Sequence, residues 1–240
     1  MERFILKKLL DWKNSPYRKP LILKGVRQVG KTWILKEFGK RYYENTAYFN
    51  FDENEEYKQF FETTKDVDRI LQNLMLASGQ KIVPEKTLII FDEVQFCPKA
   101  RQAIKHLVAD HRYDYMETGS LISIRKNVKD ILIPSEERQV QMYPMDFEEF
   151  KWALGDTVTI KLLRESFEKY QPLGDDLNRR MMRDFRLYML VGGMPKVVST
   201  YIETNNMRLI DEEKRDILRL YESDFMKIDS TGKAAMLFKS

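Results

Sequence analysis

GVRQVGKT at residues 25–32 fits the pattern GxxxxGK(S/T) in full, and the fold prediction starts from it. The pattern is typical of a P-loop, in which successive backbone N–H groups point toward a phosphate and glycine allows the bends. The apolar run PLILKG at residues 20–25 predicts a strand before the loop, and residues 31–40 predict a helix after it. An ordinary glycine-rich turn with a solvated lysine is the alternative. The position between a strand and a helix argues against that alternative.

The loop residues have distinct predicted roles toward ATP and Mg²⁺. The helix that begins at Gly30 brings the positive end of its dipole to the phosphates. Lys31 can reach the β- and γ-phosphate oxygens, and Thr32 can offer its hydroxyl to Mg²⁺. The residues predicted to contact the nucleotide are Gly25, Arg27, Gln28, Val29, Gly30, Lys31, Thr32 and Trp33. For Arg27 and Gln28, exposed positions without a ligand are an equally good interpretation.

LIIFDE at residues 88–93 is an apolar strand that ends on two carboxylates. Open α/β sheets bind their ligands at the carboxyl ends of the strands. Asp92 is predicted to hold Mg²⁺, directly or through water, and Glu93 to orient and deprotonate the attacking water. Taken alone, the pattern fits a strand that ends in a solvated turn. The P-loop upstream favours the functional interpretation.

The next candidate strand, residues 113–118, leads into small hydroxyl residues. A polar side chain there could lie between Asp92 and the γ-phosphate and sense hydrolysis. Ser120 is the preferred candidate and Thr118 the second. A strand-end turn that uses Gly and Ser for their shape explains these residues about as well.

Strand and helix patterns alternate up to residue 143, and only helical patterns follow. The expected strands are residues 20–25, 46–51, 87–91, 113–118 and 137–143, and the expected helices among them are 1–13, 31–40, 53–78 and 98–109. The later helices are expected at 146–154, 159–170, 176–190, 196–205 and 209–227. This order predicts an α/β P-loop fold, a parallel sheet flanked by helices, followed by a helical appendage. We place the core in residues 1–150 and the appendage in 151–240.

Composition narrows the class of protein. No apolar run approaches the ~18 residues of a membrane span, and the charged first helix does not resemble a secretory signal. The single cysteine, Cys97, excludes an internal disulfide and indicates a reducing cytoplasm. His106 and His111 lie far from any cysteine or His-Glu pair, which argues against a zinc site or a histidine-dependent triad.

Nucleic-acid binding is suggested only by charge. Residues 1–43 carry twelve Lys and Arg against three Asp and Glu. A basic helical face also comprises Arg179, Arg180, Arg183 and Arg186. A solvated face explains these arginines better than a nucleic-acid contact. Nucleic acid is therefore a candidate partner without support from a motif.

GVRQVGKTW, FDEVQ, the TGS that follows, MYPMDFEEF and GGMPKVV occur in the order typical of bacterial and archaeal AAA-type ATPases. The chain resembles this family, of the AAA+ or related STAND class, over nearly all of its 240 residues. The resemblance implies an ATPase core whose later helices act as a lid, with nucleotide contacts from Gly25, Gly30, Lys31, Thr32, Asp92 and Glu93. Proteins of the family often carry an uncharacterised C-terminal domain of nuclease-like appearance. With the apolar pattern of residues 234–238, this leads us to expect a further domain beyond Ser240.

ATP hydrolysis coupled to a conformational change is the leading hypothesis, with Glu93, Lys31 and Ser120 as the catalytic residues. The alternative is an ATP-operated signalling or interaction switch that turns over rarely. A P-loop kinase is less well supported, because the adjacent Asp92 and Glu93 suit the activation of water. A protein partner or a second copy of the chain is the expected partner. The sequence assigns no arginine finger; the arginines near the core motifs are Arg101, Arg112, Arg125 and Arg138.

Overall fold

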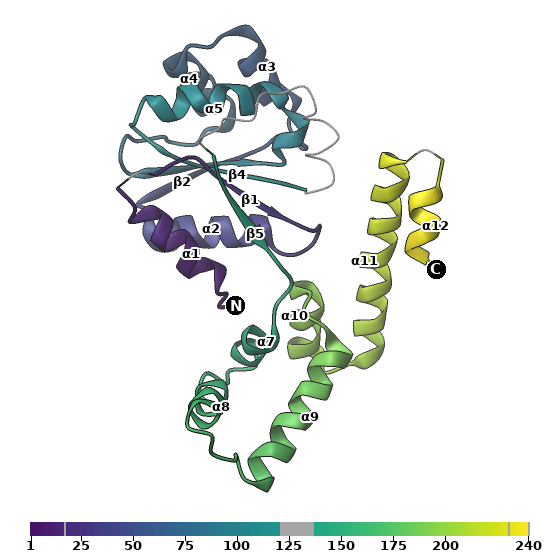
Figure 1. Ribbon diagram of the computed structural model, residues 1–240. Helices are drawn as coiled ribbons and strands as arrows, with labels where there is room; N and C mark the ends of the chain where they lie inside the picture. Colours follow the sequence, from purple (N-terminus) through teal and green to yellow (C-terminus); the bar gives the residue numbers. More distant parts are fainter. Residues whose placement is uncertain (17, 121–136, 230, 240) are drawn as a thin grey trace. The chain divides into compact units, whose positions relative to one another are not determined.

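The computed structural model describes residues 1–16, 18–120, 137–229 and 231–239 (Figure 1). The chain divides into two compact units, Lys8–Tyr143 and a second unit that joins Met1–Lys7 to Pro144–Ser240. The assignment of residues 1–150 and 151–240 to two domains stays a prediction. Among the described helices, none has the length and apolar character needed to cross a membrane.

The unit Lys8–Tyr143 is built on a five-stranded parallel sheet with the order β2-β3-β4-β1-β5. Its strands are β1 Leu21–Gly25, β2 Asn45–Asn50, β3 Thr87–Asp92, β4 Asp114–Ser120 and β5 Arg138–Met142. The strands run parallel, so their carboxyl ends share one edge of the sheet. The loop after β1 and the acidic end of β3 therefore lie at that edge. The predicted α/β fold class is confirmed.

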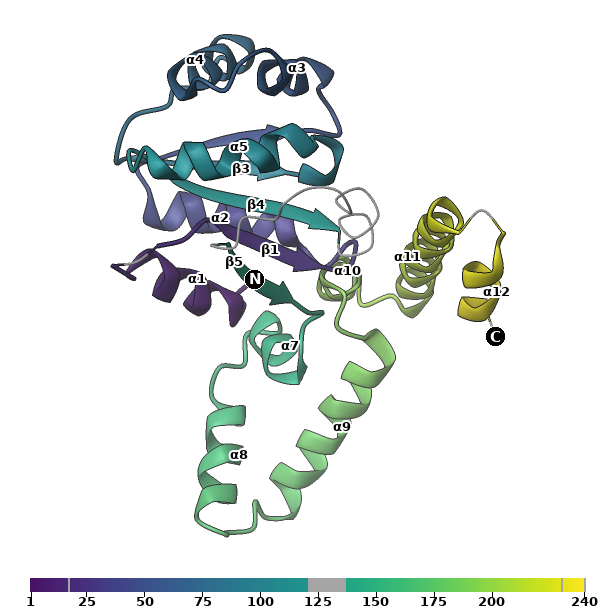
Figure 2. The same cartoon turned by 45° about the horizontal axis from the view of Figure 1, so that its top comes forward.

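Helices cover both faces of this sheet (Figures 1 and 2). One face carries α2 (Lys31–Tyr42), and the other carries α3 (Glu55–Thr63), α4 (Val67–Ser78) and α5 (Pro98–Ala109). A short 3-10 helix, η1 (Val94–Phe96), joins β3 to α5. The first helix, α1 (Ile5–Lys13), passes from one unit into the other. Its apolar residues Ile5, Leu9 and Trp12 are all buried.

Phe91 determines which way the acidic end of β3 faces. Its ring packs in an aromatic cluster with Phe49, Phe51 and Phe61, at centroid distances of 6.1, 5.5 and 5.7 Å. Successive side chains of a strand point to opposite faces of a sheet. Burial of Phe91 on the face covered by α3 and α5 therefore directs Asp92 to the other face, which carries α2.

The predicted single helix at residues 53–78 is wrong. The structure has two helices, α3 and α4, because Thr64 takes an extended conformation and Asp66 starts a new helix. The Asp66 carboxylate accepts a hydrogen bond from the Arg69 N–H at 2.9 Å, which caps α4. Asn54 caps α3 in the same way, through the Glu56 N–H at 2.9 Å.

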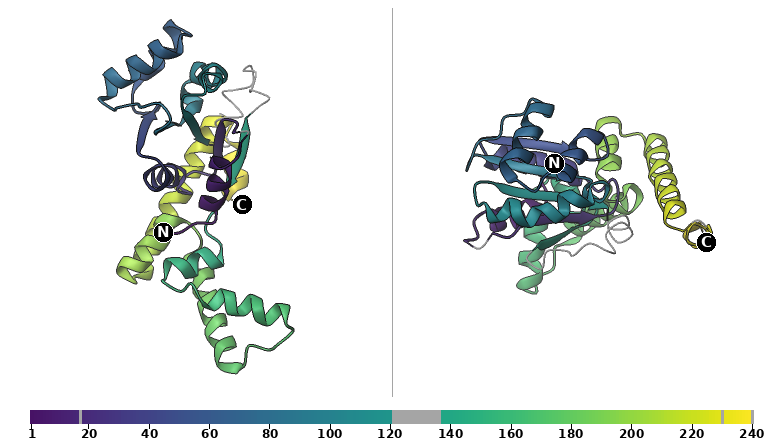
Figure 3. Two further views of the ribbon diagram at one scale, coloured as in Figure 1. Left: turned by 90° about the vertical axis from the view of Figure 1, so that its left-hand side faces the viewer. Right: turned by 90° about the horizontal axis from the view of Figure 1, so that it is seen from above.

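The second unit consists of helices. They are α7 Phe147–Ala153, α8 Thr159–Glu168, α9 Asp175–Val191, α10 Pro195–Thr204, α11 Met207–Ile228 and α12 Lys233–Lys239. Its core is a cluster that includes Phe150, Val191 and Val197. The last helix, α12, was not predicted; it lies beside α11, where Phe238 contacts Phe225 at a centroid distance of 5.0 Å (Figure 3).

Two contacts explain why particular residues of this second unit stand where they do. A Cβ on Gly193 would lie 2.1 Å from the Met145 carbonyl oxygen, so the GGMP stretch needs glycine to pass the Met145 backbone. The N-terminal residues belong to the unit because Arg3 pairs with Glu149 at 3.1 Å, and both side chains are almost fully buried.

Candidate nucleotide-binding site

The loop at residues 25–32 connects β1 to α2 and requires glycine at both ends. A Cβ on Gly25 would lie 2.7 Å from the Met142 carbonyl oxygen on the adjacent strand β5. Gly30 takes a left-handed conformation, φ 92°, directly before α2 begins at Lys31. Between them Val29 is fully buried and anchors the loop. The loop thus places the N-terminus of a twelve-residue helix at the carboxyl edge of the sheet.

Lys31 is buried although it carries an ammonium group, with a relative exposure of 7%. Its Nζ donates to the carbonyl oxygens of Gly25 and Val26, both at 3.1 Å. Burial lowers the pKa of Lys31, while the neighbouring carboxylates Glu93 and Asp92 act in the opposite direction. The ammonium is therefore held over its own loop, within reach of an anion that binds there.

Asp92 receives hydrogen bonds from three elements of the fold. The hydroxyls of Thr32 (α2) and Tyr48 (β2) both donate to Oδ2 at 2.7 Å. The hydroxyl of Thr118 (β4) donates to Oδ1, which also accepts the Glu93 N–H at 3.0 Å. A carboxylate beside a threonine hydroxyl fits Mg²⁺, which prefers oxygen ligands and binds to few protein groups when it also binds phosphates.

Glu93 has an unusual backbone. It takes a left-handed conformation, φ 55° and ψ 44°, which L-residues other than Asn and Asp rarely adopt. Its carboxylate accepts a hydrogen bond from the Gln95 side-chain amide. Burial and, to a lesser extent, Asp92 raise its pKa, whereas Gln95 and Lys31 lower it; the net direction is upward. Strained residues of this kind occur where function requires a defined orientation.

The other predicted residues lie in different surroundings. Arg27 and Gln28 are exposed, and Trp33 is 45% exposed at the start of α2. Ser120 ends β4 and pairs in register with Gly25, but its side chain lies outside the described part of the structure. The hydroxyl of Thr118, the second candidate, donates a hydrogen bond to Asp92.

The candidate arginines do not lie at the carboxyl edge where the structure describes them. Arg101 is fully buried and pairs with Glu137 and, at 3.8 Å, with Glu117, so it cannot reach another subunit. Arg112 and Arg138 lie at the amino ends of β4 and β5. Arg125 falls outside the described residues.

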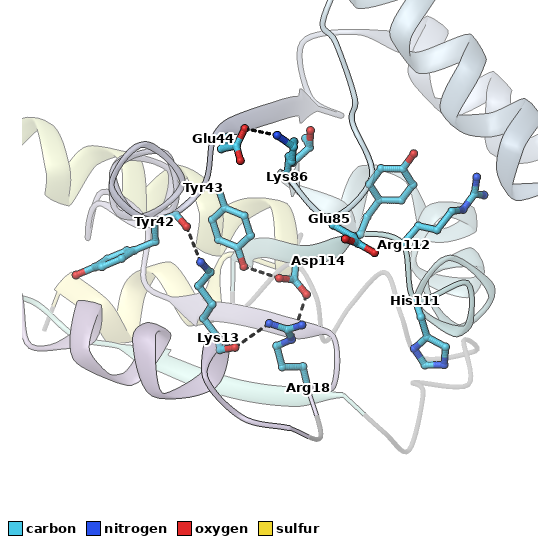
Figure 4. Close-up of a pocket in the computed structure, with 12 residues that line it drawn as sticks. Lys13, Arg18, Tyr42, Tyr43, Glu44, Glu85, Lys86, His111, Arg112 and Asp114 are labelled. Carbon is cyan, nitrogen blue, oxygen red and sulfur yellow. Dashed lines mark hydrogen bonds and ion pairs between the residues drawn. The ribbon is translucent and has the colours of Figure 1, made fainter.

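A cavity of about 490 Å³ lies at the opposite, amino edge of the sheet (Figure 4). Its walls come from the residues at and before the starts of β2, β3 and β4, with Lys13 from the end of α1 and Arg18 from the segment before β1. Inside it, the Tyr43 hydroxyl donates to Asp114 at 2.7 Å, and Arg18 pairs with the same carboxylate at 3.3 Å (Figure 4). None of the predicted site residues lines this cavity.

Sequence reasoning missed Tyr48 and Gln95. Gln95 was within reach of a prediction, because it lies two positions after Glu93 in the FDEVQ motif. Tyr48 had no such signal. It lies 44 positions before Asp92 and reaches it only because β2 and β3 are neighbours in the sheet.

Comparisons with known proteins agree with this fold. Over 177 residues, the chain is 26% identical to an uncharacterised protein of Haemophilus influenzae, a match that covers 70% of this chain and 42% of the relative. The chain therefore spans less than half of that relative. The solved structure of the Walker-type ATPase PABY2304 of Pyrococcus abyssi matches with a TM-score of 0.51 at 16% identity, over 94% of this chain and 73% of that one.

Two family descriptions match the chain. Residues 182–239 match a domain of unknown function, which gives no support to the nuclease-like domain expected from the resemblance. Residues 17–151, more than half of the chain, match the AAA domain family. That segment contains the parallel sheet, the loop at residues 25–32 and the Asp92 site. The chain therefore belongs to the AAA domain family.

Proposed function

We propose that this protein binds Mg-ATP at the carboxyl edge of the sheet and hydrolyses it. The observation that carries the proposal is the hydrogen bond of 2.7 Å between Thr32 of the loop and Asp92 of β3. It places a hydroxyl and a carboxylate together beside the buried ammonium of Lys31. Membership of the AAA domain family and the likeness in fold to a Walker-type ATPase support the same activity.

In this proposal each residue has one task. The backbone N–H groups of residues 25–32 and the Lys31 ammonium bind the β- and γ-phosphate oxygens. Thr32 and Asp92 would hold the Mg²⁺, which neutralises charge on those oxygens when bound. Ser120 is retained as a candidate γ-phosphate sensor.

Glu93 is the proposed general base. It takes a proton from water as the water oxygen attacks the γ-phosphorus, while the bond from that phosphorus to the ADP oxygen breaks. Burial raises the pKa of Glu93 toward the range in which a carboxylate is an effective base. Gln95 orients the carboxylate through its hydrogen bond.

Hydrolysis is proposed to drive a change in the second unit. Met1–Lys7 and Pro144–Ser240 form one compact unit, and the role proposed for its helices is that of a lid that responds to nucleotide. A protein partner or a second copy of the chain is the proposed recipient of the change. The buried single cysteine, Cys97, supports a reducing, cytoplasmic location.

A switch with little turnover is the second candidate. It is favoured by the hydrogen bond from Gln95, because the Glu93 oxygen that accepts this bond is less available to take a proton from water. Phosphate release measured with ATP and Mg²⁺, alongside nucleotide affinity by calorimetry, separates the two. Steady release that requires Mg²⁺ supports the hydrolase. Tight binding with no release supports the switch, and failure to bind ATP refutes both.

A further inference from the structure

From the described residues, the carboxylate of Asp92 accepts four hydrogen bonds, two on each oxygen. Thr32 and Tyr48 share Oδ2, and Thr118 with the Glu93 N–H occupies Oδ1. In the proposed function, the Thr32 hydroxyl turns its oxygen toward Mg²⁺ and no longer serves Asp92. Tyr48 then remains as the side-chain donor to Oδ2 among these contacts.

Tyr48 is held in place from both sides of its backbone. It lies in β2, which among the described strands pairs with β3 alone. The Gln80 side-chain amide takes the place of a second strand. Its oxygen accepts the Tyr48 N–H at 2.7 Å, and its nitrogen donates to the Tyr48 carbonyl at 2.9 Å. This pair of hydrogen bonds fixes the backbone from which the Tyr48 ring extends.

The ring is fixed as well. The ammonium of Lys36 lies 3.5 Å from its centroid, the geometry of a cation–π contact. Lys36 follows Thr32 by one turn of α2, so both residues face the same side of that helix. The Tyr48 side chain is thus held between the sheet edge and α2, with its hydroxyl on Asp92.

We propose that Tyr48 is a positioning residue for the magnesium site, and that it acts by orienting the carboxylate of Asp92. This inference rests on the proposed function. The physical reason is that the Tyr48 hydroxyl fixes the direction in which Oδ2 presents its free lone pair, whereas without it only the contacts to Oδ1 orient the carboxylate. Outer partners of metal ligands typically contribute ten- to a hundredfold in metal affinity or activity.

The test is Tyr48→Phe, which removes the hydroxyl and keeps the ring. Tyr43→Phe is the matched control, because Tyr43 is also half-buried and also donates to a carboxylate, Asp114, at 2.7 Å. Its hydroxyl lies at the opposite edge of the sheet (Figure 4). Calorimetry then measures ATP affinity in EDTA and at increasing Mg²⁺, and electron paramagnetic resonance measures the binding of Mn²⁺ in the presence of ATP.

For Tyr48→Phe we expect unchanged ATP affinity in EDTA and a Mg²⁺ or Mn²⁺ affinity lower by about ten- to a hundredfold. For Tyr43→Phe we expect wild-type metal affinity. Thermal unfolding of both variants shows whether the loss of a hydroxyl has the same effect on stability. Equal metal affinity in Tyr48→Phe and wild type overturns the inference. An equal loss of ATP affinity in EDTA and in Mg²⁺ overturns it as well. If Mg²⁺ has no effect on wild-type ATP binding, the proposed function itself is wrong and the inference fails with it.

Discussion

The hydroxyl of Thr32 lies 2.7 Å from Oδ2 of Asp92, although 60 positions separate the two residues in the chain. Thr32 is placed by the start of α2, and Asp92 by the end of β3. A helix and a strand that are distant in sequence thus meet at one point of the sheet edge. The proposed chemistry depends on that meeting point, and the predictions below test its parts separately.

Lys31→Ala is expected to weaken ATP binding. The substitution removes a charge-assisted contact to phosphate, which contributes roughly 1.5–3 kcal/mol. Affinity measured by calorimetry should therefore fall by about ten- to a hundredfold. Lys40→Ala, at an exposed position of the same helix, is the control and should bind as wild type does. Unchanged affinity in a folded Lys31→Ala protein would refute the P-loop assignment.

Glu93→Gln is expected to stop turnover without loss of binding. Glutamine keeps the shape of the side chain but cannot take a proton, so phosphate release should fall by ~10²–10⁴-fold. Glu85→Gln is the control, because Glu85 is also a glutamate in a left-handed conformation, φ 62°, but lies before β3 at the opposite edge. Hydrolysis at the wild-type rate in Glu93→Gln would show that another residue activates water.

Asp92→Asn is expected to change the dependence on Mg²⁺. The variant keeps a hydrogen-bonding side chain but loses the negative charge that attracts the cation. The Mg²⁺ concentration for half-maximal phosphate release should rise, while ATP affinity in EDTA should be unchanged or higher, because a charge near the phosphates is removed. An Asp92→Asn protein with the wild-type Mg²⁺ dependence would contradict the role given to this carboxylate.

Glu117 is expected to make stability depend on pH. It lies fully buried in β4, and burial raises its pKa from 4.5 to about 8, a shift that Arg101 reduces but does not cancel. The folded state therefore binds a proton that the unfolded state releases above about pH 4.5, so stability should decrease as pH rises from there toward 8. Thermal unfolding at a series of pH values in this range measures the decrease in stability. Glu117→Gln should flatten the dependence, and an equally steep curve in that variant would contradict the assignment.

Local sequence patterns predicted much of the fold. The helix at Pro98–Ala109 was predicted with its observed ends, because a proline at the first position and regular apolar spacing are local signals. The break between α3 and α4 was missed, because both segments have helical patterns and only the caps at Asn54 and Asp66 separate them. The side chain of Ser120 lies outside the described residues, so its role stays a prediction.

Sequence alone determined the loop at residues 25–32, the acidic end of β3 and the alternation that makes a parallel sheet, since each depends on neighbours within a few positions. The tertiary structure decided which side chains meet there. Tyr48 reaches Asp92 because β2 lies beside β3 in the sheet. Arg101 is buried among carboxylates because α5 packs on the sheet. Contacts of this kind depend on strand order and helix packing, which no short stretch of sequence encodes.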